Sequence, residues 1–236
     1  MLNKWAEFEF LKPVSSKGKC YIDDLSIIVF DKDGYSGIFE DIFQVLTNRP
    51  TPNVIVDAFI TSKLHSGDGY VPITWYTHYQ DPCFKGHPSL KLESSIIRNN
   101  RVICPVNTAA HGVGHTYLFV LYPRQLLLQV YDSCPQFTPK EIQMAHIKVL
   151  MKALYKGKEL PKYKIGQMKT PLQTDDHSCA IIMLYVFQTI NSTEYGRNIV
   201  LKRPSNAKLQ AIRHEIAGEL LSTTRIGREI MNYLVH

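Results

Sequence analysis

Apolar and polar residues follow one another along this chain in patterns that predict both strands and helices. An apolar run over residues 21–30 predicts a strand, and the polar residues 31–34 after it predict a turn. Apolar residues then recur at helical spacing over 38–46 and 53–64, which predicts two helices. Residues 70–100 mix aromatic residues with prolines and glycines, and they favour neither a helix nor a strand.

The middle of the chain predicts a sheet. Apolar runs cover residues 101–106, 115–123 and 125–131, and the second run is nearly continuous, as in a strand that is buried on both faces. Because the second and third runs almost touch in sequence, we expect them to form a hairpin. A short strand is expected near residues 163–165.

Helices are expected in the rest of the chain. Thr138 can cap a helix in which Pro139 takes the first position and Glu141 completes a capping box. Residues 179–189 are apolar all round, which predicts a buried helix. Ser205 begins an amphipathic helix, and a last helical segment follows it. Helices, then strands, then further helices are the order of an α+β fold.

Length and composition are those of a globular protein. The chain has 236 residues, of which 44% are hydrophobic and 20% charged, so it can bury a full core without disulfides or a structural metal. These values exclude a disordered, collagen-like or repeat protein. No apolar run approaches the ~18 residues that span a bilayer, and the N-terminal residues show no secretory signal. We therefore expect no membrane partner.

The positive charge is concentrated in one segment. The chain holds 27 lysines and arginines against 21 acidic residues, a net charge of +6. Residues 140–169 hold eight lysines against Glu141 and Glu159, and eight minus two is also six. We interpret this segment as a solvated charged surface. A nucleic acid or an inositol phosphate as its partner is a less favoured alternative.

The cysteines indicate reduced thiols rather than a disulfide or zinc framework. Their number is odd, and no CxxC motif is present. This pattern favours a cytoplasmic or nuclear location. His111 and His115 are four residues apart, but the glycines between them argue against a helix that would bring them together on a metal. The cysteines are Cys20, Cys83, Cys104, Cys134 and Cys179.

Four polar residues lie at the ends of the predicted elements. His115 begins the buried strand, Asp132 follows the next strand, and Cys179 begins the buried helix, six residues after Gln173. Neighbouring strands lie ~4.8 Å apart, so His115 and Asp132 can meet at one end of the hairpin. A thiol at a helix N-terminus is favoured as thiolate, and the backbone N–H there can hold an oxyanion with help from a glutamine. This is the layout of a Cys-His-Asp acyl-transfer site.

The order and spacing of these residues resemble the ubiquitin-like-protein proteases of the adenain-type fold, a group that includes SUMO proteases, bacterial effector deubiquitinases and adenovirus protease. The motif of that family runs approximately Pro-[Ile/Val]-Asn, His-Trp, Asp-Ser and Gln-x5-Cys-Gly. The residues that match it are Pro105-Val106-Asn107, His115, Asp132-Ser133, Gln173 and Cys179. The resemblance covers about residues 50–220. It implies a papain-like α+β fold with a central mixed sheet flanked by helices, and one catalytic domain over residues 1–236. Residues 1–48 would be an extension or accessory lobe.

The resemblance also implies a function. The chain would be a thiol isopeptidase that cuts after the C-terminal glycine of ubiquitin, SUMO, NEDD8 or a similar modifier, without a cofactor or metal. Cys179 would be the nucleophile and His115 the general base and then acid. Asp132 would orient the imidazole, and Gln173 would help to hold the oxyanion. The location would be the cytoplasm or nucleus, or the host cytosol if the protein is a secreted effector.

The chain also departs from the family motif. Thr116 replaces the Trp that helps to form the tunnel over the Gly-Gly tail of the modifier, and Trp75 is a candidate to replace it. Ser178 and Ala180 flank Cys179 where the family has Asp and Gly. Three alternatives therefore stay open. They are a YopJ-type acetyltransferase that uses the same triad, an adenain-like viral processing protease, and an inactive domain that binds a modifier.

Overall fold

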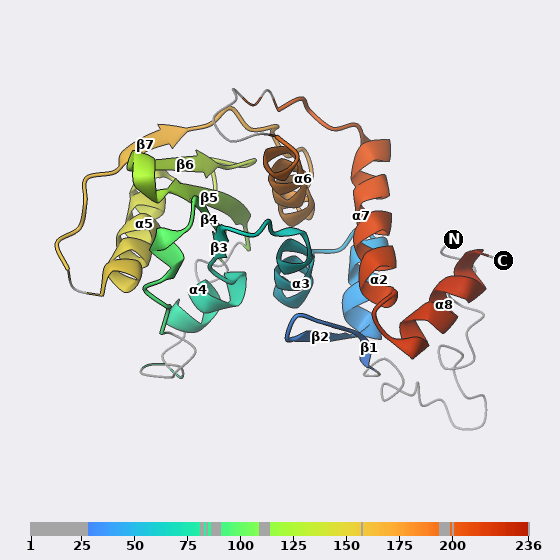
Figure 1. Cartoon of the computed structure of the whole chain (residues 1–236). Helices are drawn as coiled ribbons and strands as arrows, with labels where there is room; N and C mark the ends of the chain where they lie inside the picture. Colours follow the sequence, from blue (N-terminus) through green and yellow to red (C-terminus); the bar gives the residue numbers. More distant parts are fainter. Residues whose placement is uncertain are drawn as a thin grey trace. The chain divides into compact units, whose positions relative to one another are not determined.

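The structure, a computed structural model (Figure 1), describes residues 28–80, 83, 85, 91–108, 114–156, 158–193, 199 and 201–235. The chain divides into two compact units. One consists of Met1–Ser62 and Ser205–His236, and the other of Lys63–Pro204. The assignment of residues 1–236 to one catalytic domain, with 1–48 as an extension, stays a prediction.

The unit 63–204 is built on a mixed sheet of five strands in the order β3-β4-β5-β6-β7. The outer pairs, β3 with β4 and β6 with β7, are parallel, and the inner pairs are antiparallel. The strands are β3 (Asp68–Tyr70), β4 (Arg101–Asn107), β5 (Thr116–Tyr122), β6 (Leu127–Tyr131) and β7 (Lys164–Gln167). A turn of 3-10 helix over Pro123–Gln125 joins β5 to β6.

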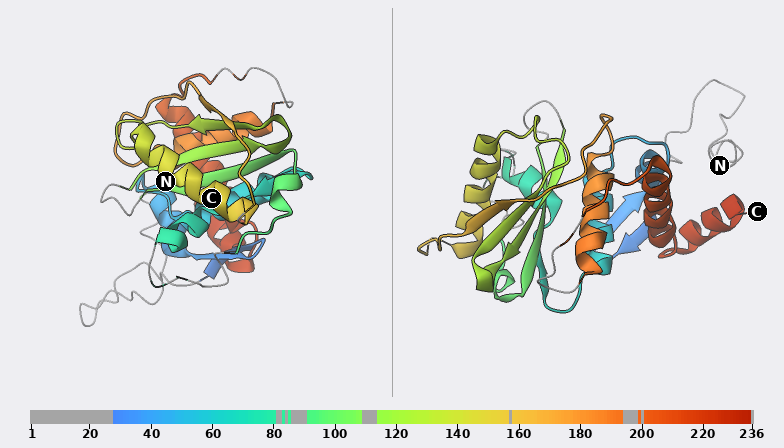
Figure 2. Two further views of the ribbon diagram at one scale, coloured as in Figure 1. Left: turned by 90° about the vertical axis from the view of Figure 1, so that its left-hand side faces the viewer. Right: turned by 90° about the horizontal axis from the view of Figure 1, so that it is seen from above.

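Helices cover both faces of this sheet. On one face, alternate side chains of β5 pack in a core with α4 (Ile73–Gln80) and α5 (Lys140–Tyr155). On the other face α6 (Cys179–Asn191) contacts β5. Figure 2 shows α5 and α6 on opposite sides of the strands. Because both faces are covered, nearly every residue of β4 and β5 is buried, which explains their continuous apolar runs.

The other unit is mostly helical. Its strands β1 (Ile28–Lys32) and β2 (Tyr35–Ile38) form an antiparallel hairpin. Within this unit α2 packs against α7, and the buried Arg213 of α7 donates a hydrogen bond to the carbonyl oxygen of Val45 at 2.9 Å. The helices are α2 (Phe39–Leu46), α3 (Asn53–Lys63), α7 (Asn206–Leu221) and α8 (Arg225–Val235). None of the described helices is long and apolar enough to cross a bilayer.

The α+β class with a mixed sheet flanked by helices is confirmed, but several local predictions are incomplete. The predicted turn 31–34 is shorter, because Asp33 and Gly34 both have positive φ (51° and 84°) and close a tight hairpin into the missed strand β2. The short strand β3 and helix α4 were also missed. The strand β3 depends on pairing with β4, and α4 depends on burial of Trp75 in the core. Neither contact can be read from the local sequence. Residues 21–27 of the predicted strand and Cys20 lie outside the described residues.

A buried ion pair joins the two parallel strands at their start. Arg101 donates from Nε and Nη2 to the two carboxylate oxygens of Asp68, at 3.0 and 2.6 Å. Its Nη1 also donates to the carbonyl oxygen of Ile190 at 3.1 Å. The side chains of Arg101 and Asp68 are 3% and 0% exposed. This cluster therefore connects β3, β4 and the end of α6 within the unit.

We expect Asp68→Ala to lower the free energy of unfolding by about 3–5 kcal/mol, because it leaves the Arg101 guanidinium buried without its carboxylate. Urea denaturation of the purified protein measures this change. The matched control is Glu229→Ala, which breaks the exposed pair between Glu229 and Arg225. That change should cost less than ~1 kcal/mol. Equal costs for the two variants would contradict the structural role of the buried pair.

Candidate active site

His115 and Asp132 meet at one end of the central hairpin. His115 immediately precedes β5 and Asp132 immediately follows β6, and Leu118 pairs with Tyr131 in the register between these strands. The antiparallel register therefore brings the two residues to the same end. The Nε2 atom of His115 lies 2.7 Å from Oδ1 of Asp132, and the two residues are 1% and 7% exposed.

The Asp132 carboxylate is held by hydrogen bonds to both of its oxygens. Oδ1 also accepts from the backbone N–H of Cys134 at 2.8 Å. Oδ2 accepts from Nε2 of Gln143 at 2.9 Å and from the hydroxyl of Thr138. Burial alone would raise the pKa of Asp132, but the bonds from His115, Thr138 and the Cys134 N–H outweigh it and lower the pKa. The group is thus a fixed, buried carboxylate.

The prediction that Thr138 caps α5 is wrong, and Thr138 instead belongs to the candidate site. The N-cap residue is Pro139, and no side chain in the described part of the chain forms a cap hydrogen bond there. The hydroxyl of Thr138 donates to Asp132 instead. Gln143, which the sequence reasoning missed, is buried and accepts a hydrogen bond from Nε2 of Gln167 at 2.8 Å. The sequence does contain an indication of this role, because Gln143 is a polar residue four positions before Ile147 and therefore lies on the buried face of an amphipathic helix.

Cys179 is the first residue of α6 and is 8% exposed. Burial alone would raise the pKa of its thiol. The imidazole of His115, through a hydrogen bond and its charge, and the backbone N–H groups of Thr116 and Ala180 outweigh burial and lower the pKa below its usual value. These groups favour the thiolate.

The pKa of His115 shifts in the opposite direction. Burial would lower it, but the hydrogen bonds and charges of Asp132 and Cys179 raise the pKa to about 9. Since Nε2 is occupied by Asp132, the other ring nitrogen is the one available to Cys179. The site therefore favours a thiolate–imidazolium pair up to about pH 9, above which His115 loses its proton.

Two aromatic side chains pack against the imidazole of His115. The ring of Tyr117 stacks on His115 with centroids 6.0 Å apart, and the ring of Phe137 lies tilted at 6.2 Å. The hydroxyl of Tyr117 lies 2.6 Å from Nδ1 of His146, and the hydroxyl of Tyr76 donates to the backbone oxygen of His146 at 3.2 Å. The packing around His115 thus leaves little rotational freedom.

Gln173 reaches the site through its main chain. Its backbone N–H donates to the carbonyl oxygen of Ser133 at 2.8 Å, which fixes the loop before α6 beside the residue that follows Asp132. The side-chain Nε2 donates to the backbone oxygen of Asp175 at 2.6 Å. Oε1 of Gln173 is buried and has no hydrogen-bond partner among the residues that the structure describes. The amide is therefore engaged within its own loop.

The acidic residues before Cys179 serve the start of α6. Oδ1 of Asp175 accepts from the backbone N–H groups of His177 and Ser178 at 3.0 and 2.7 Å. Partial burial would raise the pKa of Asp175, but hydrogen bonds from Ser178 and His177 lower it. Asp175 thus supplies the cap that the N-cap residue Ser178 does not provide. Asp176 accepts from the ring of His177 at 2.9 Å.

Trp75, the candidate to replace the Trp of the family tunnel, is a buried residue of α4. Its ring packs edge-on against Tyr76 and tilted against Tyr79, with centroids 4.9 and 5.2 Å apart, in the α4 side of the core. Thr116 is buried at the start of β5. Among the described residues no group of histidine, cysteine or acidic side chains could hold a metal ion. His111 lies outside those residues.

The comparisons with known proteins identify the fold. No protein-family model matches the sequence. A search of curated proteins also finds no match. The solved structures that the chain resembles include the C-terminal protease domain of Ulp1 in complex with Smt3, the yeast ortholog of SUMO. This match has a TM-score of 0.64 at 15% identity, over 84% of this chain and 88% of that one.

Two further structures agree. One is a de-sumoylating protease, with a TM-score of 0.63 at 12% identity over 89% of this chain and 95% of that one. The other is the catalytic domain of the Ulp1-like SUMO protease of Chaetomium thermophilum, with a TM-score of 0.61 at 12% identity and 84% coverage of both chains. The chain therefore has the Ulp1-like fold of the ubiquitin-like-protein proteases, as the sequence motif predicted.

We expect iodoacetamide to alkylate Cys179 with a pH midpoint below that of an ordinary thiol, and His115→Ala to move the midpoint upward. The substitution removes the imidazolium and leaves the burial that opposes ionisation. Mass spectrometry of the peptide that contains Cys179 measures the rate across a pH series. The exposed Cys83 is the internal reference. An unchanged midpoint in the variant would contradict the ion pair.

Proposed function

We propose that this protein is a thiol protease that cleaves after the C-terminal glycine of ubiquitin or a ubiquitin-like modifier. One observation carries the proposal. The thiol of Cys179, at the start of a buried helix, is hydrogen-bonded to the imidazole of His115, whose Nε2 lies 2.7 Å from the buried Asp132. This arrangement lies in a fold that SUMO proteases share.

The proposed reaction has two steps. In the first, the thiolate of Cys179 attacks the carbonyl carbon of the glycine, and the His115 imidazolium gives its proton to the departing amine. In the second, neutral His115 takes a proton from water, which attacks the thioester and releases the carboxylate and the thiolate. Asp132 stays ionised and holds the ring in position through both steps.

The tetrahedral intermediate carries a negative oxygen that needs hydrogen-bond donors. Cys179 is the first residue of α6, so its backbone N–H points out of the helix N-terminus and can be one donor. Gln173 is the second donor that we propose. Its Nε2 would turn from the backbone oxygen of Asp175 toward the substrate, and its main-chain bond to Ser133 keeps it within reach.

The substrate class follows from the fold and the site together. The Ulp1 domain was solved in complex with a SUMO ortholog, and we propose a modifier of that kind, such as SUMO, ubiquitin or NEDD8, for this chain. Thr116 offers a small side chain beside the nucleophile, where the resemblance implies Trp. We therefore propose a wider tunnel over the modifier tail. A reducing compartment, the cytoplasm or nucleus, would keep the Cys179 thiol active.

The direct test is covalent labelling. Ubiquitin, SUMO and NEDD8 that each carry a C-terminal thiol-reactive group are incubated with the wild-type protein and with Cys179→Ala. We expect at least one modifier to label the wild type and none to label the variant, which retains its fold because one small buried side chain replaces another. A shift of the band by gel electrophoresis measures the labelling and also identifies the modifier.

Two outcomes would overturn the proposal. Labelling that survives Cys179→Ala would place the nucleophile elsewhere. Absence of labelling by all three modifiers, together with a Cys179 that alkylates no faster than Cys83, would leave a binding domain without this chemistry.

Proteolysis should depend on pH through the same ion pair. We expect kcat/KM to rise as pH rises through the lowered pKa of Cys179 and to fall as His115 loses its proton near pH 9. Asp132→Asn should move the upper limb to lower pH, because His115 loses the carboxylate that raises its pKa. The substitution should also reduce kcat by a factor of about 10²–10⁴. A pH–rate series on a fluorogenic modifier substrate measures both effects, and an unchanged upper limb would contradict the assignment.

A further inference from the structure

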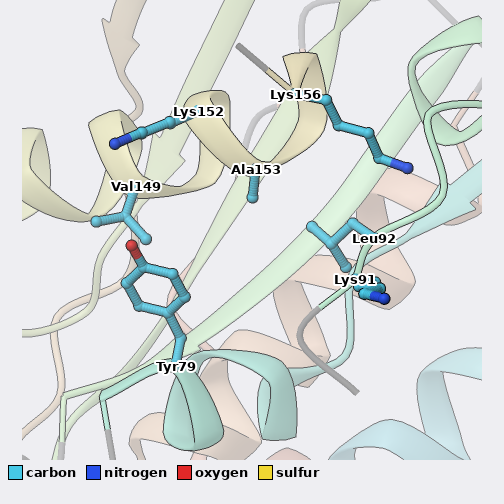
Figure 3. Close-up of a pocket in the computed structure, with 7 residues that line it drawn as sticks. All are labelled: Tyr79, Lys91, Leu92, Val149, Lys152, Ala153 and Lys156. Atoms are coloured by element: carbon cyan, nitrogen blue, oxygen red, sulfur yellow. The ribbon is translucent and has the colours of Figure 1, made fainter. Parts of the chain in front are cut away.

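A hollow outside the candidate active site lies between α4, the segment at Lys91 and the second half of α5 (Figure 3). Its volume is about 530 Å³, within the range of sites that hold a ligand or a bulky side chain. We call it the lysine pocket. It is lined by Tyr79, Lys91, Leu92, Val149, Lys152, Ala153 and Lys156.

The rim of the lysine pocket is positively charged. Lys91, Lys152 and Lys156 are exposed, and none of them forms an ion pair with a carboxylate in the described part of the chain. Figure 3 shows the ammonium groups of Lys152 and Lys156 directed to opposite ends of the hollow. The rim therefore offers positive charges spread along the pocket rather than gathered at one point.

The floor of the lysine pocket is apolar. Leu92 is buried, Val149 and Ala153 are half-buried, and Tyr79 is 44% exposed. Val149, Lys152, Ala153 and Lys156 follow one another at helical spacing, so one face of α5 provides both floor and rim. Lysines that serve only to keep a helix face in contact with water do not require an apolar hollow beside them. The combination indicates a ligand that has both negative charge and an apolar group.

Lys156 occupies a strained backbone position. It is the C-cap residue of α5 with φ of 46° and ψ of 49°, in the left-handed region where glycine or asparagine is favoured. A lysine at this position is less stable than a glycine, yet its side chain lines the lysine pocket.

The lysine pocket is remote from the candidate active site. Gln143, which contacts Asp132, lies about 20 Å from Lys156 along α5, at ~1.5 Å per residue. The helix α6, which carries Cys179, covers the opposite face of the sheet (Figure 2). A molecule in the pocket would therefore act as an anchor and not as the cleaved group.

We propose that the lysine pocket docks an acidic segment of a partner protein that inserts one large apolar side chain between Tyr79 and Ala153. The carboxylates of the segment would lie along Lys91, Lys152 and Lys156. Two observations favour a peptide over a small phosphorylated molecule. The charges are spread along the rim, and a phosphate would leave the apolar floor without a partner.

Fluorescence anisotropy tests the proposal with two labelled peptides, Asp-Glu-Phe-Glu-Asp and Asp-Glu-Ala-Glu-Asp, which carry the same charge. We expect the phenylalanine peptide to bind more tightly by roughly tenfold, because its ring is buried on the floor. Binding should weaken as salt increases, since three ammonium groups contribute. The assay measures binding and not turnover, so its failure would leave the proposed protease activity untouched.

Matched variants locate the site. Lys152→Glu with Lys156→Glu should weaken binding of the phenylalanine peptide by roughly tenfold or more. The control is Lys162→Glu with Lys202→Glu, which makes the same change of charge at exposed lysines outside the pocket and should change binding by less than about twofold. Lys156→Gly should weaken binding while Tm stays equal or rises, because glycine relieves the strained cap.

Three results would overturn the proposal. Equal binding of the two peptides would show that the apolar floor is not used. Equal losses in the two double variants would show a general charge effect. Binding of inorganic pyrophosphate that is lost in Lys152→Glu with Lys156→Glu, without peptide binding, would assign the pocket to a phosphorylated small molecule.

Discussion

The buried carboxylate of Asp132 is the group on which the candidate site depends. A carboxylate in an apolar interior is costly unless hydrogen bonds replace the water that it loses. Donors from the residue before β5, from the turn after β6 and from α5 converge on it, and they are His115, Thr138, Gln143 and the backbone N–H of Cys134. Because these donors come from separate elements, the hydrogen bonds of Asp132 also fix how the elements meet. The electrostatics of His115 and Cys179 follow from that arrangement.

The negative charge of Asp132 acts directly on His115 and, through His115, on Cys179. It raises the pKa of His115, and the resulting imidazolium lowers the pKa of Cys179. Each shift works against burial, which would favour neutral imidazole and neutral thiol. The site is therefore ionised because its members face one another, and none of them would hold its charge at this depth alone. Gln167 extends the support one step further by its bond to Gln143.

The sequence predicted the parts of the site that lie at the ends of regular elements. His115, Asp132 and Cys179 could be identified because long apolar runs mark where β5, β6 and α6 begin and end. Gln143 and Thr138 could not, because their role depends on the angle at which α5 meets the sheet. The same reason applies to the side chain of Gln173, whose direction is set by a loop. The missed elements β3 and α4 are short and form through partners distant in sequence.

Cys179 lies far in sequence from His115 and Asp132, and this separation makes the ionisation of its thiol depend on folding. His115 and Asp132 meet Cys179 only after β5 and β6 have paired and α6 has docked on the sheet. In an unfolded or newly made chain the thiol has no imidazolium nearby, and its pKa returns to that of an ordinary cysteine. At neutral pH such a chain carries its cysteine mostly as the neutral thiol. Folding itself therefore lowers the pKa of the thiol, and a molecule that loses its sheet loses that shift.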